Sequence, residues 1–419
     1  MNIAIIGSGI SGLTAAHVLH KQHSVSVFEA NDYIGGHTNT IEVKADNERK
    51  IIPVDTGFIV FNDQNYPNLT NLFEQLNVAS RESDMSFSVR CERSNLEYNG
   101  TNLDKIFSQR KNLIDPGFWI MLKDILRFHK EAPAALEKQL SDMITVEEFA
   151  GRHAYSKRFI EHYLIPLGSS LWSCPAERFR KFPMRFVLDF LNNHCMLQVD
   201  NRPTWRTVIG GSYQYIKPLT RGFANRIFTN TKVARVVRKA NKVSVHFDNG
   251  EEQDFDEVIM ATHADQSLKL VENADELEKS ILGLFPYQYN EAVLHTDTSL
   301  LPKNQKAWAS WNYRIPASSN SHAAVTYNMN MLQGIESEET YCVSLNQSQD
   351  IDENRIIRKI NYHHPVFSPG RDKAQAQHSA LIQRRGISYC GAYWGYGFHE
   401  DGVRSALSVC DSFDVELAA

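Results

Sequence analysis

Three features that would assign the chain to a class at once are missing from its 419 residues: an excess of charge, a long apolar run and closely spaced cysteines. There is no excess of charge, because 44 Lys and Arg stand against 49 Asp and Glu and the net charge is −5. This balance excludes a basic nucleic-acid binder and a highly charged disordered protein. No run of about 18 apolar residues occurs, so no transmembrane helix is expected.

Cysteine is scarce and scattered. The six cysteines lie at least twenty positions apart, so there is no CxxC pair of the kind that holds zinc or forms a redox dithiol. We therefore expect no metal site. Reduced thiols, together with an apolar N-terminus that lacks the basic segment of a secretory signal, predict a cytoplasmic protein.

The N-terminus instead has the pattern of a βαβ unit. An apolar run from Asn2 to Ile6 is broken by Gly7 to Gly12, and apolar residues then recur at helical spacing from Ile10 to Lys21. Ser24 to Phe28 returns to a β-branched strand pattern. A strand, glycine turn, helix and strand in this order require a parallel sheet.

Two later stretches resemble further parts of the same kind of domain. Lys232 to Arg238, Val243 to Phe247 and Glu257 to Ala261 predict a three-stranded meander whose last strand is buried. Ile387 to Tyr393 predicts another strand, and Gly402 to Phe413 predicts a closing helix. Two long inserts separate these pieces.

The inserts differ in character. Residues 65–198 are mostly helix-patterned, apart from strand-like segments at Met85 to Cys91 and Asn95 to Tyr98, whereas 291–345 has the period-two pattern of an antiparallel sheet. The predicted fold class is α/β: a Rossmann-like nucleotide-binding domain interleaved with an α+β substrate domain. The expected boundaries are 1–64, 205–285 and 380–419 for the first domain, and 65–204 and 286–379 for the second.

The glycine turn carries a dinucleotide-binding motif. Gly7, Gly9 and Gly12 have GxGxxG spacing directly after a strand and at the start of a helix, and Glu29 ends the next strand. The glycines permit a tight turn, a close approach of the pyrophosphate and close helix packing, while a carboxylate accepts hydrogen bonds from ribose hydroxyls. This motif alone leaves FAD and NAD as alternatives.

Two further glycine motifs favour FAD. Gly35-Gly36-His37-Thr38 and Asp55-Thr56-Gly57-Phe58 would let an extended FAD run beneath the backbone toward its flavin ring. Near the C-terminus, glycines from Gly391 to Gly402 precede a helix start, which would present amides to the negative charge of a reduced flavin. His399-Glu400-Asp401 lacks the HExxH spacing of a metal site.

Together these motifs resemble a known superfamily. GSGISG, FEA, GGHT, DTGF, DEVIMATHA and GYGFHEDG are similar to the FAD-dependent amine oxidoreductases, which include monoamine oxidases, protoporphyrinogen oxidase and phytoene desaturases. WNYRIP, VTYNMNMLQ, YHHPVF and CGAYWGYGFHEDG resemble, more narrowly, bacterial proteins related to the N-terminal flavoprotein region of plant cyclopropane fatty acid synthases.

The resemblance implies a non-covalently held FAD and a set of residues around it. It places the first glycine turn and Gly36-His37 at the pyrophosphate, Glu29 at the adenosine ribose, Gly57-Phe58 by the isoalloxazine and the last helix under the flavin. The residues expected to bind the cofactor are Gly7, Gly9, Ile10, Ser11, Gly12, Glu29, Ala30, Gly36, His37, Thr38, Gly57, Phe58, Val233, Thr262, Gly391, Glu400, Asp401, Gly402 and Val403.

The sequence departs from the family pattern in ways that bear on the reaction. His37 replaces an arginine that is common after the paired glycines. Tyr289 to His295, the expected counterpart of a strand that carries a lysine near flavin N5 in oxygen-reactive members, contains no lysine. His399 stands beside the last helix, where amine oxidases use tyrosine. These departures rank amine oxidation second.

On the substrate side, aromatic residues of the inserts are candidate pocket walls: Trp172, Trp205, Trp308, Trp311, Tyr313, Tyr327 and Met329. His399 is the predicted catalytic residue for proton transfer. Glu400 and His363-His364 are weaker candidates, because Pro365 predicts that the histidine pair ends a helix or begins a turn. The segment from Asp115 to Lys138 combines an apolar stripe with cations. Such a segment allows peripheral contact with the inner face of an anionic membrane.

The leading hypothesis is an FAD-dependent oxidoreductase that removes a hydride and a proton from a hydrophobic substrate, with a fatty-acyl or lipid-linked chain as the favoured class. One alternative is a flavin amine oxidase. Another is a flavoprotein without turnover of its own that serves an acyl-modifying methyltransferase as partner, and a third uses NAD in place of FAD. No nucleic-acid partner is expected.

Overall fold

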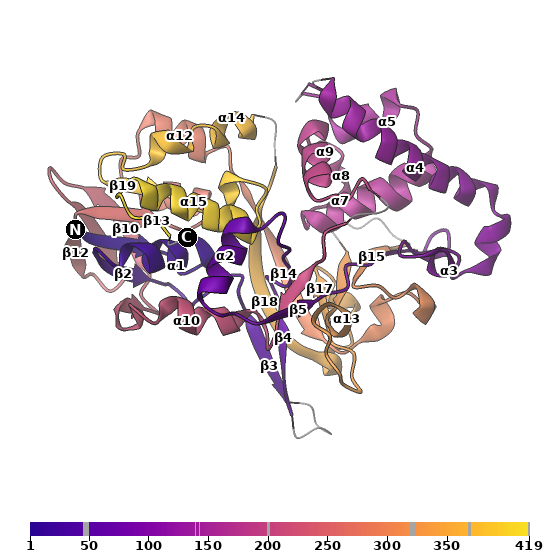
Figure 1. The fold of residues 1–419 in the computed structure, drawn as a ribbon, viewed down its shortest axis with the longest axis horizontal. Helices are drawn as coiled ribbons and strands as arrows, with labels where there is room; N and C mark the ends of the chain where they lie inside the picture. Colours follow the sequence, from indigo (N-terminus) through magenta and orange to yellow (C-terminus); the bar gives the residue numbers. More distant parts are fainter. Residues whose placement is uncertain are drawn as a thin grey trace.

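Five strands from distant parts of the chain form one parallel sheet. The computed structural model describes residues 1–44, 50–138, 140–141, 143–198, 202–317, 324–367 and 370–417. The sheet has the order β19-β13-β1-β2-β9, and each neighbouring pair is parallel. It lies on the left of Figure 1, and its strands are β1 (Asn2–Ile6), β2 (Ser24–Phe28), β9 (Ile227–Phe228), β13 (Glu257–Met260) and β19 (Ile387–Tyr389).

Two helices that are far apart in sequence pack together beside this sheet. They are α1 (Ile10–Leu19), which follows the glycine turn, and α15 (His399–Asp411), which is the last helix. Gly402 permits their close approach, because a Cβ there would lie 2.8 Å from both Ile10 Cγ2 and Ser11 Oγ. The predicted βαβ unit and the mixed α/β fold class are confirmed.

The predicted meander is wrong in its third strand. β10 (Val233–Arg238) and β11 (Val243–Phe247) pair antiparallel as expected, but the third strand is β12 (Glu252–Phe255). Glu257–Met260 instead forms β13, which pairs with β1 in the parallel sheet. The short β12 was missed because three of its four residues are exposed and polar.

A seven-stranded sheet forms the lower centre of Figure 1. Its order is β18-β14-β17-β16-β15-β6-β7, and all its pairings are antiparallel except that of β15 with β6. Its strands are β6 (Phe87–Cys91), β7 (Leu96–Asn99), β14 (Tyr287–His295), β15 (Trp311–Ile315), β16 (Val325–Asn328), β17 (Cys342–Leu345) and β18 (Ile356–Pro365). His363-His364-Pro365 therefore ends a strand, and the predicted helix end or turn is wrong.

The helical insert packs around its own aromatic core, at the upper right of Figure 1. Its helices include α3 (Leu103–Ile106), α4 (Pro116–Glu137), α5 (Val146–Arg152), α6 (Lys157–Phe159), α7 (Ile165–Leu171), α8 (Ala176–Phe179) and α9 (Met184–Asn193), with a π-helical turn η2 (Ile160–Leu164) and a 3₁₀ turn η1 (Arg110–Ile114). Among the residues that the structure describes, no helix is both long and apolar enough to cross a membrane.

Shorter elements connect these parts. Two small antiparallel sheets have two strands each. One pairs β3 (Thr40–Lys44) with β4 (Ile51–Asp55), and the other pairs β5 (Ser80–Glu82) with β8 (Arg206–Val208). The remaining helices are α2 (Pro67–Gln75), α10 (Ile216–Thr220), α11 (Ala264–Leu270), α12 (Glu276–Leu282), α13 (Met329–Gln333) and α14 (Arg371–Gln375). The domain boundaries expected from the sequence remain a prediction.

Candidate functional site

One large cavity connects the glycine turn with the helical insert. Its volume is about 1670 Å³, and it is lined by the ends of β1, β2 and β13, by β18, by the C-terminal loop and by α4. Pockets for a single ligand typically have about 300–1000 Å³. The cavity is therefore large enough for a dinucleotide and a second molecule.

The glycine turn at one end of the cavity forms an open cradle. Gly7 has φ +104°, and a Cβ at Gly12 would lie 2.1 Å from the Gly7 carbonyl oxygen, so both positions require glycine. A Cβ at Gly9, in contrast, would meet no atom within 4 Å. No side chain caps the start of α1 at Gly9, so its amides are available to an anion. This arrangement fits the pyrophosphate of a dinucleotide.

Glu29 is held in place at the end of β2. Its Oε2 atom accepts hydrogen bonds from Ser8 N at 3.0 Å and Ser8 Oγ at 2.6 Å, and its Oε1 atom accepts from Asn31 N at 2.9 Å and Asn31 Nδ2 at 2.8 Å. The side chain borders the cavity together with Ala30, Val233 and Thr262. A carboxylate oriented in this way beside the turn suits the ribose end of the same ligand.

The second glycine pair packs directly against the first turn. Gly35 N donates to Ser8 O at 2.9 Å, and a Cβ at Gly36, where φ is +60°, would lie 3.3 Å from Gly9 Cα. The following His37 lines the cavity and stacks on Tyr362, with ring centroids 4.5 Å apart. Burial, assisted by repulsion from His363, lowers the pKa of His37 to about 4. His37 is therefore neutral near pH 7 and does not replace the charge of an arginine.

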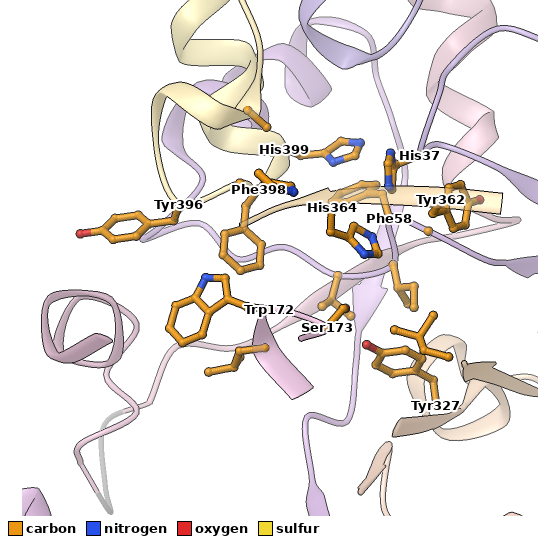
Figure 2. A pocket seen from close by; sticks show the side chains of 18 of the residues that line it. His37, Phe58, Trp172, Ser173, Tyr327, Tyr362, His364, Tyr396, Phe398 and His399 are labelled. Carbon is orange, nitrogen blue, oxygen red and sulfur yellow. The ribbon is translucent and has the colours of Figure 1, made fainter. Parts of the chain in front are cut away.

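Gly57 and Phe58 continue this wall. A Cβ at Gly57 would lie 2.3 Å from the His37 carbonyl oxygen, which accepts a hydrogen bond from Phe58 N at 2.7 Å. The Phe58 ring is stacked on the imidazole of His399. The loop after β4 and the start of α15 therefore meet at one place on the cavity wall (Figure 2).

His399 is oriented by a chain of hydrogen bonds. Its Nε2 atom lies 3.0 Å from Thr38 Oγ1, which also hydrogen-bonds to Tyr215 Oη. Burial, with a contribution from His37, lowers the pKa of His399 to about 3. The ring is thus neutral, fixed in its plane and exposed to the cavity.

The C-terminal loop is anchored from two sides. Arg371 and Gln375 of α14 donate to the carbonyl oxygens of Tyr393 and Gly395, at distances between 2.6 and 3.2 Å. Asp401 Oδ2 accepts from the backbone of Tyr396 and of Phe398. These contacts hold the loop that leads into α15 against the cavity.

The closing helix begins three residues earlier than predicted, at His399 instead of Gly402. Its first free amides therefore belong to His399, Glu400 and Asp401. Glu400 directs its carboxylate away from the cavity, where it accepts from Asn68 Nδ2 at 2.5 Å and Leu69 N at 3.0 Å at the start of α2.

The cavity brings together most of the residues that were expected to bind the cofactor. Those that line it are Gly7, Gly9, Ile10, Ser11, Glu29, Ala30, Gly36, His37, Gly57, Phe58, Val233, Thr262, Gly391 and the predicted catalytic residue His399. Those that do not line it are Gly12, Thr38, Glu400, Asp401, Gly402 and Val403. Gly12 and Gly402 allow close packing of the backbone next to the cavity, and Thr38 holds the His399 ring by a hydrogen bond. Val403 lies in the core of the parallel-sheet region.

Comparison with known proteins decides the family. A family model described as flavin containing amine oxidoreductase matches residues 10–330. The chain belongs to this family. This flavin amine oxidoreductase is an FAD-dependent oxidoreductase that acts on a small molecule. The glycine cradle, the fixed Glu29 and the size of the cavity fit that cofactor.

Solved structures share the fold over nearly the whole chain. Putrescine oxidase with bound putrescine has 14% identity and a TM-score of 0.68, and 99% of each chain is covered. Cyclohexylamine oxidase from Brevibacterium oxydans IH-35A has 14% identity and a TM-score of 0.69, also with 99% of each chain covered. A CLA-producing fatty acid isomerase from P. acnes has 15% identity and a TM-score of 0.68, with 98% of each chain covered. No curated protein matches the sequence.

The oxidoreductase also brings Tyr362 and His263 to the cavity, which the sequence did not single out, together with His364, one of its weaker candidates for proton transfer. Tyr362 and His364 come from β18, and His263 follows β13. His263 stacks on Tyr287 with centroids 4.2 Å apart, and His364 Nδ1 hydrogen-bonds to the Asn290 amide at 2.7 Å. Only the pairing of β14 with β18 creates this group, so no local pattern could reveal it. Among the described residues, no three His, Cys, Asp or Glu side chains are arranged to hold a metal ion.

The predicted aromatic walls are divided. Figure 2 shows Trp172 and Tyr327 below the group of His37, His364 and His399. Trp172, Trp205, Trp311 and Tyr327 line the cavity, whereas Trp308, Tyr313 and Met329 do not. Trp119 and Tyr396 line it without having been proposed as walls.

Proposed function

We propose that the oxidoreductase removes a hydride and a proton from a hydrophobic chain, in the first instance a fatty-acyl or lipid-linked chain. The observation that carries this proposal is the continuity of the cavity. From Phe58 and His399 it passes between aromatic walls to the side chains of Trp119, Leu122 and Leu126 on α4. An elongated apolar substrate matches this path better than a compact polar one.

The residues around the path support proton and water control. Trp172, Tyr327 and Phe398 form walls that exclude water from a bound substrate. His399 is the proposed residue for proton transfer, because it lines the cavity beside Phe58 and its Nε2 atom joins a hydrogen-bond chain to Thr38 and Tyr215. FAD, when bound, supplies the hydride acceptor.

Contact with a lipid surface is part of the same proposal. Large apolar side chains on α4 and just before it are exposed: Leu103 by 75%, Ile114 by 86%, Ile120 by 52% and Leu126 by 61%. Leu103 and Leu126 also line the cavity, so this apolar surface is continuous with the path. A surface of this kind would let a lipid chain enter without crossing water.

The test is anaerobic reduction of the bound flavin. The purified, yellow holoenzyme is mixed without oxygen with fatty acids and acyl lipids, and separately with putrescine and cyclohexylamine, while the visible spectrum is recorded. We expect loss of the flavin absorbance with an acyl compound and none with the amines. Bleaching by amines alone would favour the amine oxidase alternative, to which the family description and two similar structures point.

A second measurement tests the alternative of a flavoprotein without turnover. The flavin is reduced by light and then exposed to oxygen, a quinone or an electron carrier. An active oxidoreductase is reoxidised by at least one of these acceptors. A flavin that stays reduced with all of them would contradict the proposed function.

A further inference from the structure

One face of α4 (Pro116–Glu137) forms the far end of the cavity, away from the glycine turn. Trp119, Lys123, Leu126 and His129 follow one another at spacings of three or four residues, and all four line the cavity. This spacing places them along one side of a helix. The far end therefore combines apolar side chains with polar ones.

A half-buried polar pair lies at this end. His129 Nε2 and Tyr163 Oη, from α4 and the π-helical turn η2, are 3.0 Å apart, and both residues line the cavity. Burial, with the charge of Arg202, lowers the pKa of His129 to about 4, so its ring is neutral. The pair offers a hydroxyl and an imidazole to a ligand among otherwise apolar walls.

Two cations border the same end. Arg202 lines the cavity, with its Nε atom donating to Gln198 O at 2.7 Å, and its charge acts on both His129 and Tyr163. Lys123 lines the cavity from α4 and is exposed. Within the described parts of the chain, neither Lys123 nor Arg202 forms an ion pair with a carboxylate.

Two carboxylates, Glu82 and Asp84, also line the cavity. Asp84 Oδ1 accepts hydrogen bonds from Ser86 N at 2.8 Å and Ser310 Oγ at 2.7 Å, and from Ser86 Oγ, so its charge is already stabilised by the protein. Glu82, at the end of β5, forms no ion pair among the described residues, so the cavity wall also carries a negative charge, but the side chains that border the α4 end, Lys123 and Arg202, are both positive. Unpaired cations beside an apolar path are suited to an amphiphile with a negative head.

We propose that Lys123, Arg202 and the His129–Tyr163 pair bind the anionic head group of a single-chain amphiphile whose tail extends into the cavity. The carboxylate of a fatty acid and the phosphate of an alkyl phosphate share this chemistry. The inference rests on the proposed function only for the idea that the tail is the substrate chain. Recognition of the head group is measured without turnover.

The experiment is calorimetric titration of the oxidised holoenzyme with four ligands of equal chain length: dodecanoate, dodecyl phosphate, dodecanol and dodecylamine. We expect both anions to bind at least about tenfold more tightly than the alcohol. Tighter binding of dodecyl phosphate than of dodecanoate would identify a phosphate head, and the reverse order a carboxylate. Equal affinity for anion and alcohol, or preference for the amine, would overturn the proposal.

Variants locate the site. Lys123→Gln and Arg202→Gln should each weaken dodecanoate binding by about three- to tenfold and leave dodecanol binding unchanged. Lys130→Gln, an exposed lysine of α4 that does not line the cavity, and Arg221→Gln, an exposed arginine of the parallel-sheet region, are the matched controls. Equal losses in the controls would refute the assignment. Melting temperature and flavin spectrum verify the fold of each variant.

The two proposals fail in distinguishable ways. If dodecanoate binds through Lys123 and Arg202 but no acyl compound reduces the flavin, the head-group site stands and the proposed reaction is wrong. If acyl compounds reduce the flavin but the substitutions change neither affinity nor KM, the reaction stands and the head-group site is wrong.

Discussion

The imidazole of His399 lies flat against the phenyl ring of Phe58, with ring centroids 3.7 Å apart and planes inclined by 15°. The contact joins the start of the last helix to the loop that follows β4. With the Thr38 hydrogen bond on Nε2, it leaves the ring little freedom to rotate. A ring with a fixed plane presents its nitrogen atoms to a substrate in one direction, which is the geometry that proton transfer requires.

Substitution of His399 should slow the reaction without removing the cofactor. We expect His399→Asn to retain FAD and to lower the rate of flavin reduction by an acyl substrate by about 10²-fold. Thr38→Val, which removes the hydrogen bond but keeps the volume, should have a smaller effect in the same direction. Stopped-flow absorbance under anaerobic conditions measures both rates, and native rates in both variants would exclude His399 from proton transfer.

Two glycines of the first turn should respond differently to alanine. Gly9→Ala places a methyl group in the open cradle, so the protein should fold normally and lose FAD. Gly12→Ala places it 2.1 Å from the Gly7 carbonyl oxygen, so FAD is lost and the free energy of unfolding falls by about 1–3 kcal/mol. Flavin content and urea unfolding distinguish the cases, and a Gly9→Ala protein with full FAD would show that the cradle is not the cofactor site.

Glu400 should stabilise the fold and have no role in cofactor binding. Its carboxylate accepts from Asn68 and Leu69 at the start of α2, where Tyr66 provides no side-chain cap. Glu400→Gln should lower the free energy of unfolding by about 1 kcal/mol, because it removes a charge next to a helix N-terminus. FAD affinity, measured by flavin fluorescence, should be unchanged. A large loss of affinity would restore the original expectation that Glu400 binds the cofactor.

Acidification from pH 7 to pH 5 should destabilise the protein. The native pKa of His37 and His129 is about 4 and that of His263 and His399 about 3, in each case chiefly because of burial. Since these values lie below the ordinary 6.5, the unfolded chain binds more protons than the folded chain between about pH 4 and 6.5. Each of these histidines therefore lowers the free energy of unfolding at pH 5 by about 1–2 kcal/mol. Burial raises the pKa of Asp55 to about 6. This shift has the opposite effect on stability, because the stabilisation from the protonated carboxyl is lost as the pH rises through 6.

Urea unfolding at pH 7 and pH 5 tests this balance. Burial also lowers the pKa of His194 and His295 to about 4 and raises the pKa of Glu257 to about 7. These histidines outnumber the two carboxyl groups, so the native protein should be more stable at pH 7. His399→Asn should reduce the difference between the two pH values, because one of the histidines is removed. Equal stability of the native protein at both pH values would contradict the assignment of neutral buried histidines.

The apolar surface near α4 should bind anionic vesicles. Leu113→Ser/Ile114→Ser removes two exposed apolar side chains and should weaken sedimentation with phosphatidylglycerol vesicles by about tenfold. The control is Ile209→Ser/Phe228→Ser, two apolar residues elsewhere on the molecule that are exposed by 52% and 43%. Equal effects of both pairs, or concentration-dependent dimerisation that disappears only in the first pair, would show that the surface does not bind lipid.

The sequence predicts best what depends on local geometry. Gly7 and Gly12 occur at positions where only glycine avoids a clash, so their spacing predicted the turn, the strand before it and the helix after it. Most of the predicted cofactor residues line one cavity because their positions also follow from local patterns. Each lies at a glycine turn or a strand end, which a single sequence can reveal.

What the sequence missed depends on contacts between distant segments. β18 has no clean alternation, because of its ten residues only Tyr362 is buried, and its histidines reach the cavity only through pairing with β14. Glu257–Met260 was assigned to the meander because its neighbours in sequence are strands, whereas its burial is decided by β1. The orientation of Glu400 likewise depends on α2, more than 300 positions away.

The parallel sheet is completed only by the end of the chain. β19 is an edge strand of the sheet, and α15 packs on α1 although the two helices stand at opposite ends of the sequence. During synthesis at the ribosome, β1 can pair with β2 and β13 once Met260 has emerged, whereas α1 stays uncovered until α15 is made. We therefore expect a chain truncated before α15 to leave an apolar side of α1 exposed and to purify without the yellow coenzyme.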